Sequence, residues 1–170
     1  ENANNVDDKL CLINIDTDGA EVWHSLYGGG GADGGNHISE VSGGGYIIAG
    51  ATKSYGNGNW DDLWLVKTST GGSMEWQKTF GGSYTETGNY AHEKDAGGYM
   101  VTGSTESIGQ GLYDIWVVST DYTGNEIYSQ TFGGSMDDKA IRGARGNSGE
   151  LLIIGYTNSF GNGGEDVLLI

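Results

Sequence analysis

The sequence predicts an all-β protein built from an internal repeat. Three aromatic residues, Trp23, Trp76 and Tyr128, mark the repeat at spacings of 53 and 52 residues. Between glycine-rich turns the chain has short apolar segments rich in branched and aromatic side chains, and it contains neither a helical period nor a proline. A period of roughly fifty residues is typical of arrays of small β-sheets rather than of a domain with a single core.

The first repeat shows where its strands are expected. Apolar, branched or alternating residues predict strands over 10–16, 21–27, 36–42 and 46–52, the third being the weakest. Turn residues separate these segments at 17–19, 28–29 and 43–45. We therefore expect four short strands in each repeat.

The same register can be followed through the later repeats. Three sets of residues align: Tyr46, Tyr99 and Leu151; Gly50, Gly103 and Gly155; and Thr52, Thr105 and Thr157. We expect a polar N-terminal segment over 1–8 and a repeat domain over 9–170, with repeats at about 9–61, 62–113 and 114–165 and the start of a fourth at 166–170. Because the chain opens without a methionine and stops inside an apolar run, we also expect the natural protein to be longer.

Some of the predicted strands are apolar on both faces. The segments 63–66 and 115–118 have this character, which predicts sheets covered on both sides by neighbouring sheets. Cys11 occupies the register position of Trp64 and Trp116, so we expect it to be a small buried apolar side chain.

The charge balance limits the classes of partner. The chain has 8 Lys and Arg residues against 23 Asp and Glu residues, a formal net charge of −15. Nucleic acid or an anionic membrane surface would have to overcome that field, so neither is expected as a partner. Apolar runs are also too short for insertion into a membrane. Acidity suits an extracellular or cell-surface protein and leaves room for bound calcium ions.

Carboxylates recur at one position of the repeat and are the first candidate site. An acidic residue follows each Gly-Gly pair, at Asp33, Glu86 and Asp138. These carboxylates are candidate calcium ligands, because calcium prefers carboxylate and loop carbonyl oxygens. They are also compatible with a structural role in which they accept hydrogen bonds from backbone N–H groups at a corner.

Aromatic residues at the ends of long loops are the second candidate site. Trp60 and Tyr113 occupy equivalent positions, each close to an aspartate, Asp62 or Asp114. Such a combination could bind a sugar ring or a protein partner. Alternatively, the aromatic side chains close the apolar space between sheets, and the aspartates satisfy backbone N–H groups of the loop.

No catalytic constellation is visible. His24, His37 and His92 fall at three different register positions and so predict no histidine metal site. The loops with the pattern T-x-S-x-G-x-G precede a strand rather than a helix, which argues against a phosphate-binding loop. We expect a protein that is not an enzyme.

The repeat resembles a known architecture. Its pattern of D-x-W-x-V, then T-F-G-G-S, then G-G-Y and G-x-T-x-S-x-G-x-G is similar to the tandem β-propeller repeats of secreted and cell-surface proteins of archaea and bacteria, and to the Kelch plan. The resemblance implies β-propeller blades of four antiparallel strands, each beginning with its innermost strand. About three blades would be present, which is fewer than a closed ring needs. The expectation is therefore a partial propeller or one assembled from several copies.

Three functions follow as hypotheses. The first is a binding, adhesion or scaffolding module for a glycan or protein on a cell surface. The second is a subunit of a homopolymeric extracellular filament that associates through open strand edges. The third is part of a propeller enzyme with its active site in other blades.

Overall fold

The computed structural model describes residues 8–147 and 149–170, and this part of the chain contains strands and no helix. It therefore has no helix able to cross a membrane. Of the predicted polar segment 1–8, only Asp8 lies among the described residues. The strands are β1 (Leu10–Ile15), β2 (Glu21–Tyr27), β3 (Asp33–Glu40), β4 (Tyr46–Thr52), β5 (Asp62–Thr68), β6 (Met74–Phe80), β7 (Glu86–Glu93), β8 (Tyr99–Thr105), β9 (Asp114–Thr120), β10 (Glu126–Phe132), β11 (Asp138–Arg145), β12 (Leu151–Thr157) and β13 (Asp166–Leu169).

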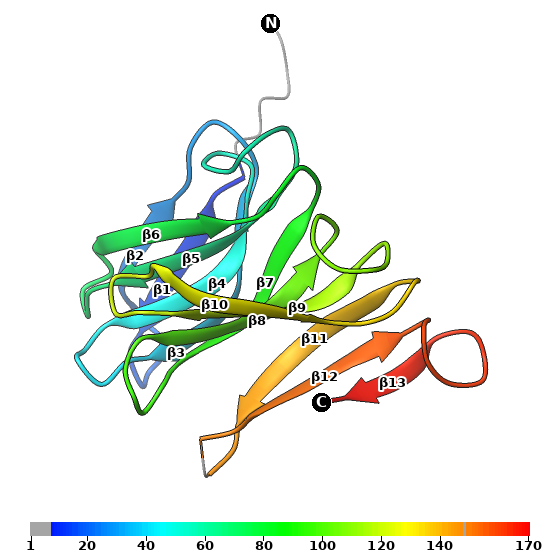
Figure 1. The fold of residues 1–170 in the computed structure, drawn as a ribbon. Coiled ribbons are helices and arrows are strands. Elements are labelled where there is room, and N and C mark those ends of the chain that lie inside the picture. Colours follow the sequence, from blue (N-terminus) through cyan, green and yellow to red (C-terminus); the bar gives the residue numbers. More distant parts are fainter. Residues whose placement is uncertain (1–7, 148) are drawn as a thin grey trace, which may run out of the picture.

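These strands form antiparallel sheets that follow the repeat. β3–β4–β5–β6 and β7–β8–β9–β10 are four-stranded, β11–β12–β13 is three-stranded and β1–β2 is a hairpin. The all-β prediction and the expected four-stranded sheets are thus confirmed. The hairpin and the β11–β13 sheet lie on opposite sides of the molecule, so the described residues form no closed ring (Figure 1).

The first strand of each larger sheet carries the same irregularity. The register shifts between Gly35 and His37, between Gly88 and Tyr90, and between Ala140 and Arg142, which is the pattern of a β-bulge. Opposite the bulge in β7, a Cβ atom on Gly103 would lie 1.7 Å from the carbonyl oxygen of Thr87. Only glycine fits there, which explains why glycine recurs at this register position.

The bulge directs asparagine side chains toward the next sheet. The bulged residue Asn36 donates from Nδ2 to the carbonyl oxygen of Gly88, at 3.0 Å, and Asn89 donates likewise to Ala140. At the same position β11 has Ile141, which is exposed. This asparagine ladder therefore links β3 to β7 and β7 to β11, and ends at Ile141.

Apolar clusters between the sheets form the core. Leu10 and Tyr27 of the hairpin pack on Trp64 and Val66 of the next sheet, while the opposite face of that sheet, which carries Leu63, packs on the β7–β10 sheet. A further cluster joins the β7–β10 sheet to β11–β13. The prediction of sheets covered on both faces is confirmed for β5 and β9, in which every residue is buried.

The prediction for Cys11 is wrong. Its side chain is exposed, whereas Trp64 at the equivalent position is completely buried. The β1–β2 hairpin is the first of the packed sheets, and no described sheet covers the face of it that carries Cys11.

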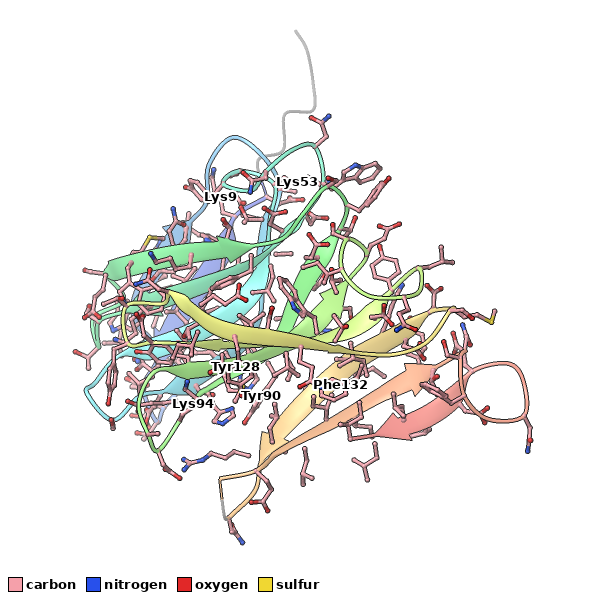
Figure 2. All side chains as sticks on the ribbon, in the orientation of Figure 1. Lys9, Lys53, Tyr90, Lys94, Tyr128 and Phe132 are labelled. Atoms are coloured by element: carbon pink, nitrogen blue, oxygen red, sulfur yellow. The ribbon has the colours of Figure 1, made fainter. Side chains whose placement is uncertain are left out.

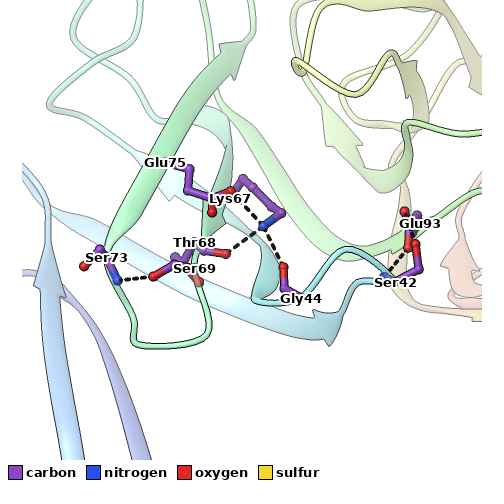
Figure 3. Close-up of polar contacts among 8 residues, drawn as sticks. All are labelled: Ser42, Gly44, Lys67, Thr68, Ser69, Ser73, Glu75 and Glu93. Atoms are coloured by element: carbon purple, nitrogen blue, oxygen red, sulfur yellow. Dashed lines mark hydrogen bonds and ion pairs between the residues drawn. The ribbon is translucent and has the colours of Figure 1, made fainter.

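Polar side chains form hydrogen bonds with the turns at one edge of the β3–β6 sheet, and we call the contacts of Lys67 the clamp (Figure 3). The buried Lys67 Nζ donates to the carbonyl oxygens of Gly44 and Thr68, at 3.0 and 2.7 Å, and pairs with Glu75 at 2.9 Å. Nearby, Glu93 accepts a 2.6 Å hydrogen bond from the N–H of Ser42, which ties the β3–β4 turn to the following sheet.

Candidate functional site: the carboxylate corners

The predicted calcium ligands lie buried where one sheet passes into the next. Asp33, Glu86 and Asp138 are the first residues of β3, β7 and β11, and each follows a Gly-Gly pair that ends the preceding sheet. We call these three places the carboxylate corners. The strand that begins there positions the carboxylate, and the loop after the next strand surrounds it.

Each corner carboxylate accepts a recurring set of hydrogen bonds. Glu86 accepts from the hydroxyl of Thr105 and the N–H of Ser107, both at 3.0 Å, and from the N–H of Gly82 at 2.8 Å. At the other corners, Asp33 accepts hydrogen bonds from Thr52, Ser54 and Gly29, and Asp138 accepts hydrogen bonds from Ser159 and Gly134. This geometry supports the structural role that the sequence left open.

The hydrogen bonds also set the ionisation of Asp33 and Asp138. Burial opposes the charged form of Asp33, but donors on Ser54, Thr52 and the backbone outweigh it, so the pKa of Asp33 is lowered. For Asp138, burial is likewise outweighed by Ser159, Thr157 and backbone donors, and its pKa is lowered. Both groups are therefore carboxylates at neutral pH.

The aspartates predicted to bind a ligand close the long loops. Asp62 and Asp114 begin β5 and β9 and are buried. Asp114 Oδ2 accepts from the N–H groups of Gln110 and Gly111 at 2.7 and 3.1 Å, and Asp62 Oδ2 accepts from Asn57 at 2.8 Å. One oxygen of each aspartate thus caps its own loop.

The structure brings the two predicted sets together. A Cβ atom on Gly81 would lie 2.4 Å from Asp62 Oδ1 and 2.5 Å from Glu86 Oε2, and one on Gly133 would lie 1.9 Å from Asp114 Oδ1 and 2.9 Å from Asp138 Oδ2. Two carboxylates therefore approach each other across a glycine. We call Asp62–Glu86 and Asp114–Asp138 the carboxylate pairs. Burial, with a contribution from the charges of Glu86 and Asp61, raises the pKa of Asp62.

The corner of Asp33 differs from the other two. Lys9 occupies the register position of Asp62 and Asp114, directly before the apolar strand. Its side chain runs beside Asp33, because Lys9 Cδ and Asp33 Oδ2 would lie 2.9 and 2.5 Å from a Cβ atom on Gly28, and its Nζ donates to the carbonyl oxygen of Gly29. This corner has a single carboxylate beside a lysine side chain whose Nζ binds a backbone carbonyl oxygen.

The two aromatic candidates, Tyr113 and Trp60, have different surroundings. Tyr113 is half-buried, with Lys139 Nζ 3.6 Å from its ring centroid, and its carbonyl oxygen accepts from the N–H of Asp138 at 2.7 Å. Trp60 is exposed on the loop between β4 and β5. Tyr113 is thus part of its corner, whereas Trp60 is presented to solvent.

No group of three His, Cys, Asp or Glu side chains gathers for a metal ion within residues 8–147 and 149–170. Calcium binding at Asp33, Glu86 and Asp138 stays a prediction.

A cluster on the first strands was missed by the sequence analysis. The His37 and Tyr90 rings are 4.4 Å apart and Tyr90 and His92 are 5.5 Å apart; Tyr90 is labelled in Figure 2. Burial, followed by the charges of Arg145 and His37, lowers the pKa of His92 to about 4, although Asp95 acts in the opposite direction. A signal existed: His37 and Tyr90 share a register position, and His92 lies two residues further on, on the same face of the strand.

The outer faces of the end sheets are apolar and exposed. The exposed apolar side chains of β1–β2 include Cys11, Ile13 and Leu26, and we call the face that carries them the leading face. On β11–β13 they are Leu152, Ile154, Val167 and Leu169, which we call the trailing face. Their register equivalents within the stack are buried: Trp64 and Val66 correspond to Cys11 and Ile13, and Leu63 and Leu65 correspond to Val167 and Leu169.

Comparison with known proteins adds no relative. No protein-family model matches the chain, and no curated protein matches its sequence.

Proposed function

We propose that this chain is a non-catalytic scaffolding module of a secreted or cell-surface protein, in which propeller-type sheets associate head to tail. The leading face of one copy binds the trailing face of the next. The register equivalence of these exposed faces to buried interfaces carries the proposal: Ile13 is 54% exposed and Val167 78%, while Val66 and Leu63, their equivalents, are completely buried.

The expected contact follows from the interfaces inside the molecule. Within the stack, the Trp64 face of one sheet packs on the Leu10 face of the sheet before it. The leading face is equivalent to the Trp64 face, and the trailing face is equivalent to the Leu10 face. A leading face and a trailing face can therefore pack together as successive sheets do within the stack. Burying Val167 and Leu169 would contribute about 1.5–3 kcal/mol for each side chain. A contact between unlike faces gives a ring when the rotation closes and a filament when it does not.

The oligomeric state of the 170-residue chain tests this proposal. Light scattering after size exclusion, over a range of concentrations, should show association, as one discrete mass for a ring or a growing mass for a filament. Ile13→Lys and Val167→Lys place charges on exposed positions and should each give monomers. Leu112→Lys changes an exposed loop residue outside both faces and should associate like the wild type.

Mixing the two monomeric variants gives the sharper result. Ile13→Lys keeps its trailing face and Val167→Lys keeps its leading face, so the mixture should form a heterodimer that grows no further. A wild-type chain that stays monomeric at all concentrations would overturn the proposal, and so would variants that associate as the wild type does.

Exposed apolar side chains on the loops favour a second candidate function. Tyr55, Trp60, Ile108, Leu112 and Phe160 are exposed on the loops at 53–61, 106–113 and 158–165, which leave the same edge of the sheets. This edge would bind a glycan or a protein on a cell surface. A glycan array probed with the wild type and with Trp60→Ala tests it: binding lost in the variant supports this function, and an array without any signal counts against the glycan.

A further inference from the structure

We propose that a divalent cation, with calcium as the expected ion, binds between Asp114 and Asp138 and between the equivalent pair Asp62 and Glu86, while the corner of Asp33 binds none. The inference does not depend on the proposed self-association.

The first argument is a buried oxygen without a hydrogen-bond partner. Asp114 is 2% exposed, and its Oδ1 has no hydrogen-bond partner among residues 8–147 and 149–170. This oxygen points toward Gly133 and the Asp138 carboxylate, as the glycine geometry shows. A buried carboxylate oxygen without a partner lowers the stability of the folded state. A cation bound to this oxygen would remove that cost.

The second argument is the accumulation of negative charge. Asp138 is completely buried and lies on the other side of Gly133. Within the described part of the chain, the ion pairs join Glu21 to His24, Lys67 to Glu75 and Asp95 to Arg145, so the carboxylate pairs take part in none of them. Two buried like charges repel unless a cation lies between them.

The third argument is the substitution at the first corner. Where Lys9 replaces the aspartate, the stem of a lysine side chain lies beside the remaining carboxylate, Asp33, and the Lys9 Nζ donates to the carbonyl oxygen of Gly29 (Figure 2 labels Lys9). The first corner thus has one carboxylate with a lysine in place of the second, whereas the other two corners each have two carboxylates. Two carboxylates meet only where the lysine is absent, so a bound cation is expected at those two corners and not at the corner of Asp33.

The donor atoms indicate which cation fits. Both pairs offer carboxylate oxygens, and the carbonyl oxygens of Gly134 and Met136 lie next to the loop that Asp114 caps, 2.7 and 2.4 Å from a Cβ atom on Gly111. An oxygen-only site suits calcium rather than zinc or copper. With two carboxylates per site, affinity on the order of 10⁻⁴ to 10⁻³ M is expected, as in extracellular modules.

Titration of the full chain with CaCl₂ at pH 7.5, by calorimetry at constant ionic strength, tests the inference. The wild type should bind two calcium ions, Asp114→Asn and Asp62→Asn one each, and the double variant none. Asp33→Asn should still bind two, and so should Asp18→Asn, which changes an exposed acidic residue. Lys9→Asp recreates a carboxylate pair and should add a third ion.

Melting temperatures separate loss of binding from loss of folding. Calcium should raise the melting temperature of the wild type by several degrees and leave that of the double variant unchanged. Magnesium should have a smaller effect, because it gives up its water less readily. A wild type without saturable calcium binding would overturn the inference. Unchanged stoichiometry in the double variant would place the ions elsewhere and would also overturn it.

Discussion

Replacing Thr105 by valine should destabilise the protein well beyond the effect of removing a methyl group. The hydroxyl of Thr105 donates to Glu86 Oε1 at 3.0 Å and accepts from the N–H groups of Ser107 and Ile108, both at 3.1 Å. Valine has the same shape and removes all three bonds. A hydrogen bond to a charged group contributes about 1.5–3 kcal/mol, and the loop N–H groups lose an acceptor, so we expect a cost of about 2–4 kcal/mol.

Thr105→Ser is the matched control, because it keeps the hydroxyl and loses one methyl group, for about 1 kcal/mol. Urea unfolding at pH 7, followed by tryptophan fluorescence and by circular dichroism, gives the free energy of unfolding of each variant. In a Glu86→Gln background the valine substitution should cost less, since the charged acceptor is gone. If Thr105→Val were as stable as Thr105→Ser, the hydrogen-bond network of the corner would contribute little, and the reasoning would be refuted.

Three further substitutions test the fold. Gly103→Ala should lower the free energy of unfolding by about 3 kcal/mol, because the new methyl group meets a backbone carbonyl; Gly30→Ala, with open space around it, should change it by less than about 0.5 kcal/mol, and equal effects would contradict the close approach. The folded-state pKa of His92 is lowered to about 4 from an ordinary value of 6.5, so the unfolded chain takes up its proton first as the pH falls. Stability should therefore decline between pH 6.5 and 4, by about 2 kcal/mol from pH 7 to 5; His92→Phe should remove that part of the slope, and an identical slope would exclude His92 as its source. Lys67→Met should cost about 2 kcal/mol, because Lys67 bridges two turns, whereas Lys53→Met on the surface should cost almost nothing; equal urea midpoints would show that the clamp of Figure 3 is dispensable.

The strands could be predicted because apolar patterning and glycine turns agree at every repeat. The main exception is β3, expected over 36–42 and found at Asp33–Glu40, so that it begins three residues earlier. Gly34 and Gly35 have little intrinsic preference for a strand. Their place in β3 depends on pairing with β4 and on Leu10, which fills the space beside Gly35. Such tertiary contacts leave no local pattern in the sequence.

The sequence predicted the corner carboxylates and the loop aspartates as two separate features. It could not predict that the two sets lie next to each other. Asp114 and Asp138 belong to strands separated by a hairpin and a Gly-Gly corner, and only the fold places them around Gly133. Cys11 shows that burial also cannot be predicted from the register position alone. Its register position is buried in the interior sheets, but burial requires a covering sheet, and register alone does not say where a stack of sheets ends.

The end of the asparagine ladder has a consequence for temperature. Because Ile141 stands where Asn36 and Asn89 donate hydrogen bonds, a sheet that docks on the trailing face receives no asparagine donor from β11. It would be held chiefly by apolar surface, and hydrophobic association weakens on cooling. Assemblies of this chain should therefore loosen in the cold, while the hydrogen-bonded joints inside each copy persist.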